Sequence, residues 1–147
     1  MNNGSTASEK HAHRAGMPGI GGNMKVISTD KAPAAIGPYS QGIVANGMLF
    51  ASGQIPIIPE TGELMTGDIT DQAHQAIKNA GEILKAAGSS FDKVVKTTCF
   101  LADMNDFAAF NAVYEQYFTG KPARSCVAVK TLPKNVLCEV EVTAVVE

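Results

Sequence analysis

The sequence lacks several features that would point to particular kinds of protein. It contains no tryptophan, and its three cysteines, at positions 99, 126 and 138, form no CxxC pair. An odd number of widely spaced cysteines is typical of free thiols in a reducing compartment, and it argues against a disulfide framework or a zinc site. No apolar run approaches the ~20 residues that a membrane span needs. We therefore predict a cytoplasmic protein with no membrane contact.

The charged residues show no excess of either sign. The 147 residues carry 12 Lys and Arg against 14 Asp and Glu, which gives a formal net charge of −2. This balance provides no basic field for nucleic acid or an anionic membrane, so we expect neither as a partner. Hydrophobic residues make up 45% of the chain and charged residues 18%, the composition of an ordinary globular domain.

Residues 1–23 lack hydrophobic periodicity. They are polar and rich in glycine, and they hold two of the three histidines, His11 and His13. Two histidines without a third ligand are a weak indication of a metal site. We predict that residues 1–23 form a tag, a linker or a disordered leader, and that residues 24–147 form one domain. A transit peptide is the alternative, although it would usually carry more arginine.

The pattern from residue 24 onward alternates between strand and helix. Asn46-Gly47, flanked by apolar triplets, is the strongest short indication of a hairpin in the chain. Period-2 and period-3.6 patterns then predict the other elements. Strands are expected at 24–28, 43–50 and 94–101, and helices at 68–87 and 106–118. This order favours an α+β fold, a mixed sheet with two helices stacked on one face.

Residues 121–147 have the pattern of two strands joined by a short loop, and we predict that they form a hairpin. If the two strands pair so that their valines lie on the same face of the hairpin, Cys126 is opposite Glu139 and Arg124 is opposite Glu141. A guanidinium, a thiol and two carboxylates would then share the face away from the core. A solvated face with a cross-strand ion pair is one interpretation. Because cysteine is usually buried, we expect a neighbouring subunit or a ligand to cover this face.

Four motifs occur in order along residues 24–147. They are Ala35-Ile36-Gly37-Pro38-Tyr39-Ser40-Gln41, Ala51-Ser52-Gly53-Gln54-Ile55-Pro56, Asn105-Asp106-Phe107 with Asn111-Ala112-Val113-Tyr114, and Pro122-Ala123-Arg124-Ser125-Cys126-Val127. With these motifs the sequence resembles the RidA/YjgF family of reactive intermediate deaminases, which act on enamines and imines. The resemblance implies a chorismate-mutase-like fold and a homotrimer around a central barrel, with active sites between subunits. It also implies no metal or organic cofactor.

The resemblance further implies a substrate and residue roles. The substrate would be a 2-aminoacrylate-like enamine or its imine, a small carboxylate hydrolysed to a 2-keto acid and ammonia. Arg124 would bind the substrate carboxylate, Glu139 would orient water, and Cys126 would help to place the imine. The substrate-binding residues that the resemblance implies are Tyr39, Ser52, Gly53, Asn111 and Arg124.

Other interpretations stay open. Cys126 could instead be a covalent nucleophile, but the only histidine in residues 24–147 that could activate it is His74, and Arg124 alone would be a modest perturbation. The protein could instead be a ligand-binding or chaperone-like module, or a translation inhibitor or ribonuclease acting on RNA. The acidic balance and the lack of a catalytic histidine pair argue against RNA. A chorismate-mutase-type enzyme is a third alternative, but one cationic site at Arg124 suits a monocarboxylate better than a dicarboxylate.

Overall fold

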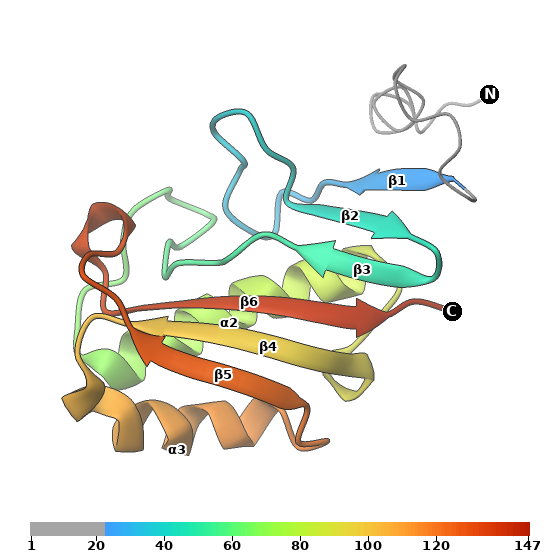
Figure 1. Cartoon of the computed structure of the whole chain (residues 1–147). Helices are drawn as coiled ribbons and strands as arrows, with labels where there is room; N and C mark the ends of the chain where they lie inside the picture. The colour runs from blue at the N-terminus through green and yellow to red at the C-terminus, as the bar shows by residue number, and fades with distance from the viewer. Residues whose placement is uncertain (1–22) are drawn as a thin grey trace.

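A six-stranded mixed sheet organises the computed structural model, which describes residues 23–147 (Figure 1). Its strand order is β1-β2-β3-β6-β4-β5, and every neighbouring pair is antiparallel except β4 and β5. The leader predicted for residues 1–23 falls almost wholly outside the described residues. The strands are β1 (Met24–Ile27), β2 (Gly42–Ala45), β3 (Met48–Ala51), β4 (Val94–Leu101), β5 (Ala123–Ala128) and β6 (Cys138–Val145).

The hairpin predicted at residues 43–50 is confirmed as β2 and β3. Asn46 and Gly47 both have positive φ, 52° and 74°, as a type I′ turn requires. Ala45 pairs with Met48 across the turn. The chain leaves β3 through Ser52, whose backbone N–H donates to the carbonyl of Gln41 at 2.9 Å.

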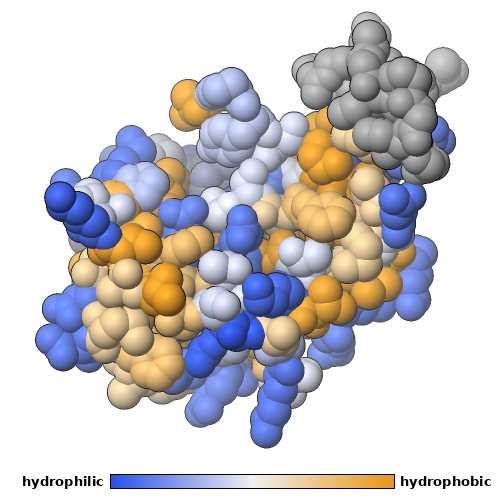
Figure 2. Space-filling view, in the orientation of Figure 1, coloured by the Kyte–Doolittle hydropathy of each residue, from blue (hydrophilic) through white to orange (hydrophobic). Residues whose placement is uncertain are grey.

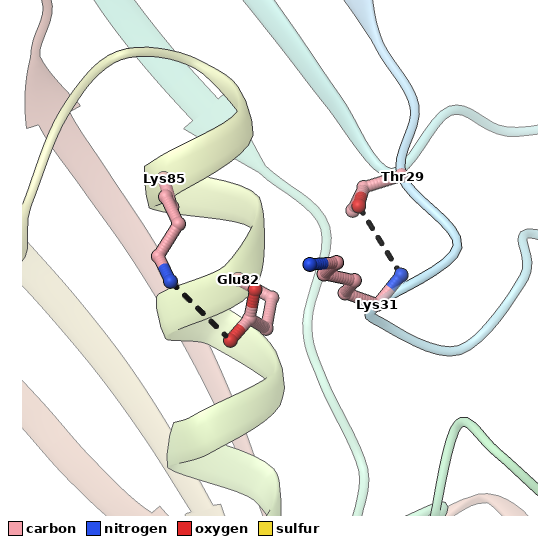
Figure 3. A network of polar contacts seen from close by, with 4 residues as sticks. All are labelled: Thr29, Lys31, Glu82 and Lys85. Carbon is pink, nitrogen blue, oxygen red and sulfur yellow. Dashed lines mark hydrogen bonds and ion pairs between the residues drawn. The ribbon is translucent and has the colours of Figure 1, made fainter.

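The first predicted helix is confirmed as α2 (Ile69–Ala86). Asp68 caps it by accepting a hydrogen bond from the Asp71 backbone N–H at 3.1 Å. In Figure 1, α2 lies behind the sheet, and it contacts β3 and β6. Its opposite side carries a surface ion pair between Lys85 and Glu82 at 4.0 Å; Figure 3 draws this pair and, separately, the hydrogen bond from the Lys31 backbone N–H to the Thr29 hydroxyl. Exposed pairs of this kind add little stability.

The second predicted helix is confirmed as α3 (Phe107–Tyr117), which packs against α2. Phe110, Val113 and Tyr114 are buried, whereas Phe107 and Tyr117 are half-buried at the rim of the core. Neither α2 nor α3, nor any shorter helical turn within residues 23–147, combines the length and hydrophobicity that a membrane-spanning helix requires.

The hairpin predicted for residues 121–147 is wrong, because β4 lies between β5 and β6. Helix α3 carries the chain from the end of β4 back to its beginning, so that β5 runs parallel to β4 as in a β-α-β unit. The following residues, 129–137, return the chain to the other side of β4, where β6 pairs antiparallel. The predicted pairs of Arg124 with Glu141 and of Cys126 with Glu139 therefore do not form.

The two faces of the sheet also divide the predicted site residues differently. Cys126 lies level with the buried Cys99 and faces the helices, as does Arg124 two residues earlier. Glu139 lies level with Phe100 and faces the other way. The shared polar face predicted from the sequence is therefore wrong. Valine faces the core on β6 but faces outward on β5, where Val127 is 47% exposed.

The face away from the helices, which we call the open face, is partly hydrophobic. Figure 2 views this face and shows hydrophobic side chains on either side of a polar band. Phe50 of β3 is 52% exposed and Val127 of β5 is 47% exposed there. Exposed apolar surface of this kind marks sites of association.

Candidate functional site

Arg124 lies at the edge of the sheet against one face of α3. Its Nη1 donates to the Asn111 side-chain oxygen at 2.6 Å. Its Cζ lies 4.7 Å from the centroid of the Tyr114 ring and 5.4 Å from that of Phe107. The three contact residues are spaced by four and three positions, so they share one side of the helix. Helix α3 thus holds the guanidinium by one hydrogen bond and two aromatic contacts.

Arg124 has no carboxylate partner within residues 23–147. The ion pairs in this part of the chain are Lys85 with Glu82 and Lys93 with Glu147. A guanidinium has five N–H donors, and the bond to Asn111 uses one of them. A half-buried, oriented cation with free donors is suited to bind a carboxylate through two parallel hydrogen bonds.

Cys126 forms a thiol pair with Cys99 on the helix-facing side of the sheet. The two residues are paired across β5 and β4, and the Cys99 Sγ donates to the Thr97 Oγ1 at 4.0 Å. The adjacent Cys99 thiol, helped by the Arg124 charge, lowers the pKa of Cys126 to about 7 although burial opposes the change. Burial raises the pKa of Cys138 to about 12. Among the three cysteines, Cys126 is thus the one whose pKa is lowered, whereas Cys99 is fully buried in the core.

We expect alkylation of Cys126 by iodoacetamide to titrate with a midpoint near pH 7. Cys99→Val should move the midpoint to higher pH, because it removes the neighbouring thiol that lowers the pKa of Cys126. Peptide mass spectrometry of timed reactions across a pH series would measure both midpoints. Cys138→Val is the matched control, since Cys138 is buried like Cys99 but does not contribute to the lowered pKa of Cys126. An unchanged midpoint in Cys99→Val would show that the thiol pair does not tune Cys126.

Glu139 forms a second group with Ser52 and Gly53. The segment after β3 is fastened to β6 by two backbone bonds between Gln54 and Val140, at 2.8 and 3.0 Å. Gly53 is thereby pressed against the Glu139 carboxylate, and a Cβ atom at Gly53 would collide with it. The Ser52 hydroxyl donates to the Ser40 carbonyl at 2.6 Å. Burial, with a smaller contribution from Glu141, raises the pKa of Glu139.

Tyr39 is more exposed than the other predicted site residues. Its side chain is 54% exposed and lines a cavity of about 430 Å³ between β1 and the segment that leads into β2. Ser40, its neighbour, receives the hydrogen bond from Ser52. Tyr39 is therefore joined to the group of Glu139 through the backbone rather than by direct contact.

Within one chain, the predicted site residues form two separate groups, one around Arg124 and one around Glu139. In the register of the sheet, Arg124 aligns with Val142 and Glu139 aligns with Val127. Arg124 and Glu139 are therefore offset along the strands, and their side chains lie on opposite faces of the sheet. The charge that raises the pKa of Glu139 comes from Glu141, and Arg124 does not contribute.

Sequence reasoning missed the aromatic residues and the threonine that surround Arg124. The positions of Phe107, Asn111 and Tyr114 on the predicted helix share one side, and this spacing could have identified Tyr114 as a neighbour of Asn111. His74 Nδ1 and the Tyr117 hydroxyl share a hydrogen bond at 2.8 Å. Between residues 23 and 147, no cluster of three or more His, Cys, Asp or Glu could hold a metal ion.

The chain belongs to the RidA/YjgF family, whose model, described as Endoribonuclease L-PSP, matches residues 29–146. The resemblance drawn from the four motifs is confirmed. A mouse protein named 2-iminobutanoate/2-iminopropanoate deaminase is 52% identical over 122 residues, which cover 82% of this chain and 90% of the relative. The human protein of the same name is 51% identical over 122 residues, covering 82% of this chain and 89% of the relative.

Solved structures of relatives share the fold. The crystal structure of E. coli TdcF with bound serine is 47% identical, with a TM-score of 0.80 over 84% of this chain and 99% of that one. The structure of the E. coli YjgF gene product is 50% identical, with a TM-score of 0.79 over 82% of this chain and 98% of that one. The predicted mixed α+β fold is therefore confirmed.

Proposed function

We propose that the protein is a hydrolytic deaminase of reactive enamine and imine intermediates from amino-acid metabolism. The observation that carries this proposal is Arg124, an oriented and half-buried cation without a carboxylate partner in the described residues. The names of the mouse and human relatives support the reaction. The serine bound in the E. coli TdcF structure supports a small amino-acid-derived ligand.

The proposed reaction joins an imine and water to give a 2-keto acid and ammonia. Arg124 holds the substrate carboxylate, and Glu139 accepts a proton as water attacks the imine carbon. Glu139 returns this proton to the nitrogen, which gives a carbinolamine. The carbinolamine hydroxyl then passes its proton to the nitrogen, the carbon–nitrogen bond breaks, and the carbonyl forms as ammonia leaves. An enamine first gains a proton at its terminal carbon and loses one from its nitrogen to become the imine. Cys126, Ser52 and Gly53 place the reacting atoms, and Tyr39 and Asn111 complete the pocket.

The proposal requires a second copy of the chain. Because Arg124 and Glu139 face opposite sides of the sheet, we propose a homotrimer in which each site takes Arg124, Asn111 and Cys126 from one subunit and Glu139 from the next. Self-association would also cover Phe50 and Val127 on the open face. The trimer then supplies both the substrate cation and the base in one cleft.

The direct test is release of ammonia and keto acid from imines generated in situ by an amino-acid oxidase or dehydratase. Wild type should accelerate release over the buffer rate, and Arg124→Ala should return it close to that rate. Lys130→Ala is the control, because it removes an exposed positive charge from the same region of the chain. Equal release with and without wild-type protein would reject the deaminase. RNA cleavage by wild type that survives Arg124→Ala would favour the RNA-directed alternative.

The pH dependence should report the environment of Glu139. The proposed base must be deprotonated, so kcat should fall as the pH drops through the raised pKa of Glu139. Glu141→Gln removes a neighbouring negative charge, which lowers the pKa of Glu139 and should move the acidic limb of kcat to lower pH. A kcat profile for wild type and variant measures the shift. A limb that moves to higher pH, or does not move, would contradict the role of Glu139 as base.

A further inference from the structure

Beneath the guanidinium of Arg124 lies a buried pair of hydroxyl groups that the proposed reaction does not use. Thr97 of β4 is fully buried, and Tyr114 of α3 is 8% exposed. The Thr97 Oγ1 and the Tyr114 hydroxyl oxygen are 2.7 Å apart. A hydroxyl in a core is unfavourable unless it is hydrogen-bonded, and valine would fill a similar volume without one. The Thr97 Oγ1 also accepts a long hydrogen bond from the Cys99 Sγ at 4.0 Å, so the short bond to Tyr114 is the main contribution of the threonine hydroxyl.

The hydrogen bond to Thr97 fixes the Tyr114 ring under the guanidinium. The Tyr114 ring also stacks on Phe118, with centroids 4.4 Å apart, and packs against Phe110 at 5.9 Å. Burial raises the pKa of Tyr114, so its hydroxyl keeps its proton at neutral pH and the pair with Thr97 stays uncharged. The Tyr114 ring is therefore fixed at its hydroxyl by Thr97 of β4 and on its faces by Phe110 of α3 and by Phe118, which follows α3.

Asn111 and Tyr114 constrain Arg124 in complementary ways. The hydrogen bond from Nη1 to Asn111 limits rotation of the guanidinium within its own plane. The Tyr114 ring, 4.7 Å from Cζ, limits tilting of that plane. A bidentate carboxylate contact depends on both, because the two N–H donors must be parallel and must face the ligand.

We infer that Tyr114 and Thr97 are positioning residues that orient Arg124 to bind the substrate carboxylate. The inference rests on the proposed function, in which Arg124 is the carboxylate ligand. Neither residue touches substrate in this account. Both act through the guanidinium, so their loss should weaken carboxylate binding more than it slows the chemical step.

The decisive variant is the double substitution Thr97→Val with Tyr114→Phe. Each single variant leaves one buried hydroxyl without the 2.7 Å hydrogen bond of the pair, and its melting temperature should fall. The double variant removes both hydroxyls and should recover much of that loss. A merely structural pair would therefore restore KM in the double variant. Positioning predicts instead that KM stays raised by roughly threefold to tenfold, with kcat nearly unchanged, which is less than the ~10²-fold effect of a 1 Å misplacement.

Thr98→Val is the matched control, because it makes the same chemical change one residue along β4 on the open face. The second readout is the order parameter of the Arg124 Nε–H group by ¹⁵N NMR, measured without ligand. It should be high in wild type and Thr98→Val, and lower in the double variant. This readout needs no turnover, so it separates the inference from the proposed function.

The outcomes divide as follows. Absence of deamination and of 2-oxobutanoate binding in wild type would reject the proposed function, and the Arg124 order parameter would then decide the positioning role alone. A double variant with wild-type order at Arg124 would overturn the inference whatever its KM. A double variant with wild-type KM on an active enzyme would overturn it as well. Lower order with raised KM, absent from Thr98→Val, is the expected result.

Discussion

Arg124→Ala should lower kcat/KM for imine hydrolysis by about 10²-fold or more, with the protein still folded. The substitution removes the cation that we propose binds the substrate carboxylate, and loss of one partner of a buried ion pair is worth roughly 2–5 kcal/mol. Asn111 and Tyr114 would remain in place but would lose their contacts with the guanidinium. Initial rates of keto-acid and ammonia release measure the loss, and the melting temperature shows that the fold persists.

Arg124→Lys separates charge from geometry. Lysine keeps the positive charge but cannot make two parallel hydrogen bonds, and it cannot lie flat on the Tyr114 ring in the way a guanidinium does. Activity should therefore fall sharply, although less than in Arg124→Ala. If Arg124→Ala kept its deaminase activity while the assembly dissociated, the arginine would be an interface residue and its assignment to the substrate would fail.

Glu139→Gln should reduce kcat by about 10²-fold or more, because an amide cannot accept a proton from water. Glutamine has nearly the same shape as glutamate, so it should fit beside Gly53 without displacing that segment. Binding of a keto-acid product analogue should be preserved or improved, because the negative charge near the ligand is lost. Stopped-flow or steady-state rates give kcat, and calorimetry gives the dissociation constant of the analogue.

Glu141→Gln provides the control for Glu139→Gln. It makes the same chemical change two residues along β6 on the same face, at a side chain that is exposed. It should shift the pH profile but leave the maximal rate close to that of wild type. Equal rates in Glu139→Gln and wild type would show that Glu139 is not the base.

Local structure could be predicted well from this sequence because its causes are local. The β2–β3 turn is determined by Asn46 and Gly47, whose positive φ values allow few other conformations. The helix face of α2 and its cap at Asp68 follow from spacing and from one carboxylate. Each of these features depends on residues within a few positions of one another.

The partner of β5 could not be predicted, because strand pairing depends on residues distant in sequence. The alternation in β5 was identified correctly, but its valine faces the open side and Cys126 faces the core. Nothing within residues 123–128 shows which face a parallel edge strand will bury. The predicted hairpin with β6 followed from the assumption that valines always face inward.

The motifs single out candidate site residues but not their arrangement. They predict roles for Arg124, Cys126 and Glu139, yet they do not show that the sheet separates Glu139 from the other two. Contacts such as Gly53 with Glu139 and Thr97 with Tyr114 connect segments that are far apart along the chain or on different elements. Such contacts are visible only once the fold is known.

Mixing two inactive variants tests the shared site most directly. Arg124→Ala and Glu139→Gln subunits are unfolded together, mixed one to one and refolded, with light scattering to confirm trimers. If Arg124 of one subunit faces Glu139 of the next, random mixing should leave about one quarter of the sites intact and restore about that fraction of wild-type activity. Mixing Arg124→Ala with the double variant Arg124→Ala/Glu139→Gln forms no intact site and should restore none. Recovery in the first mixture alone is the predicted result, and equal inactivity of both mixtures would contradict a site shared between subunits.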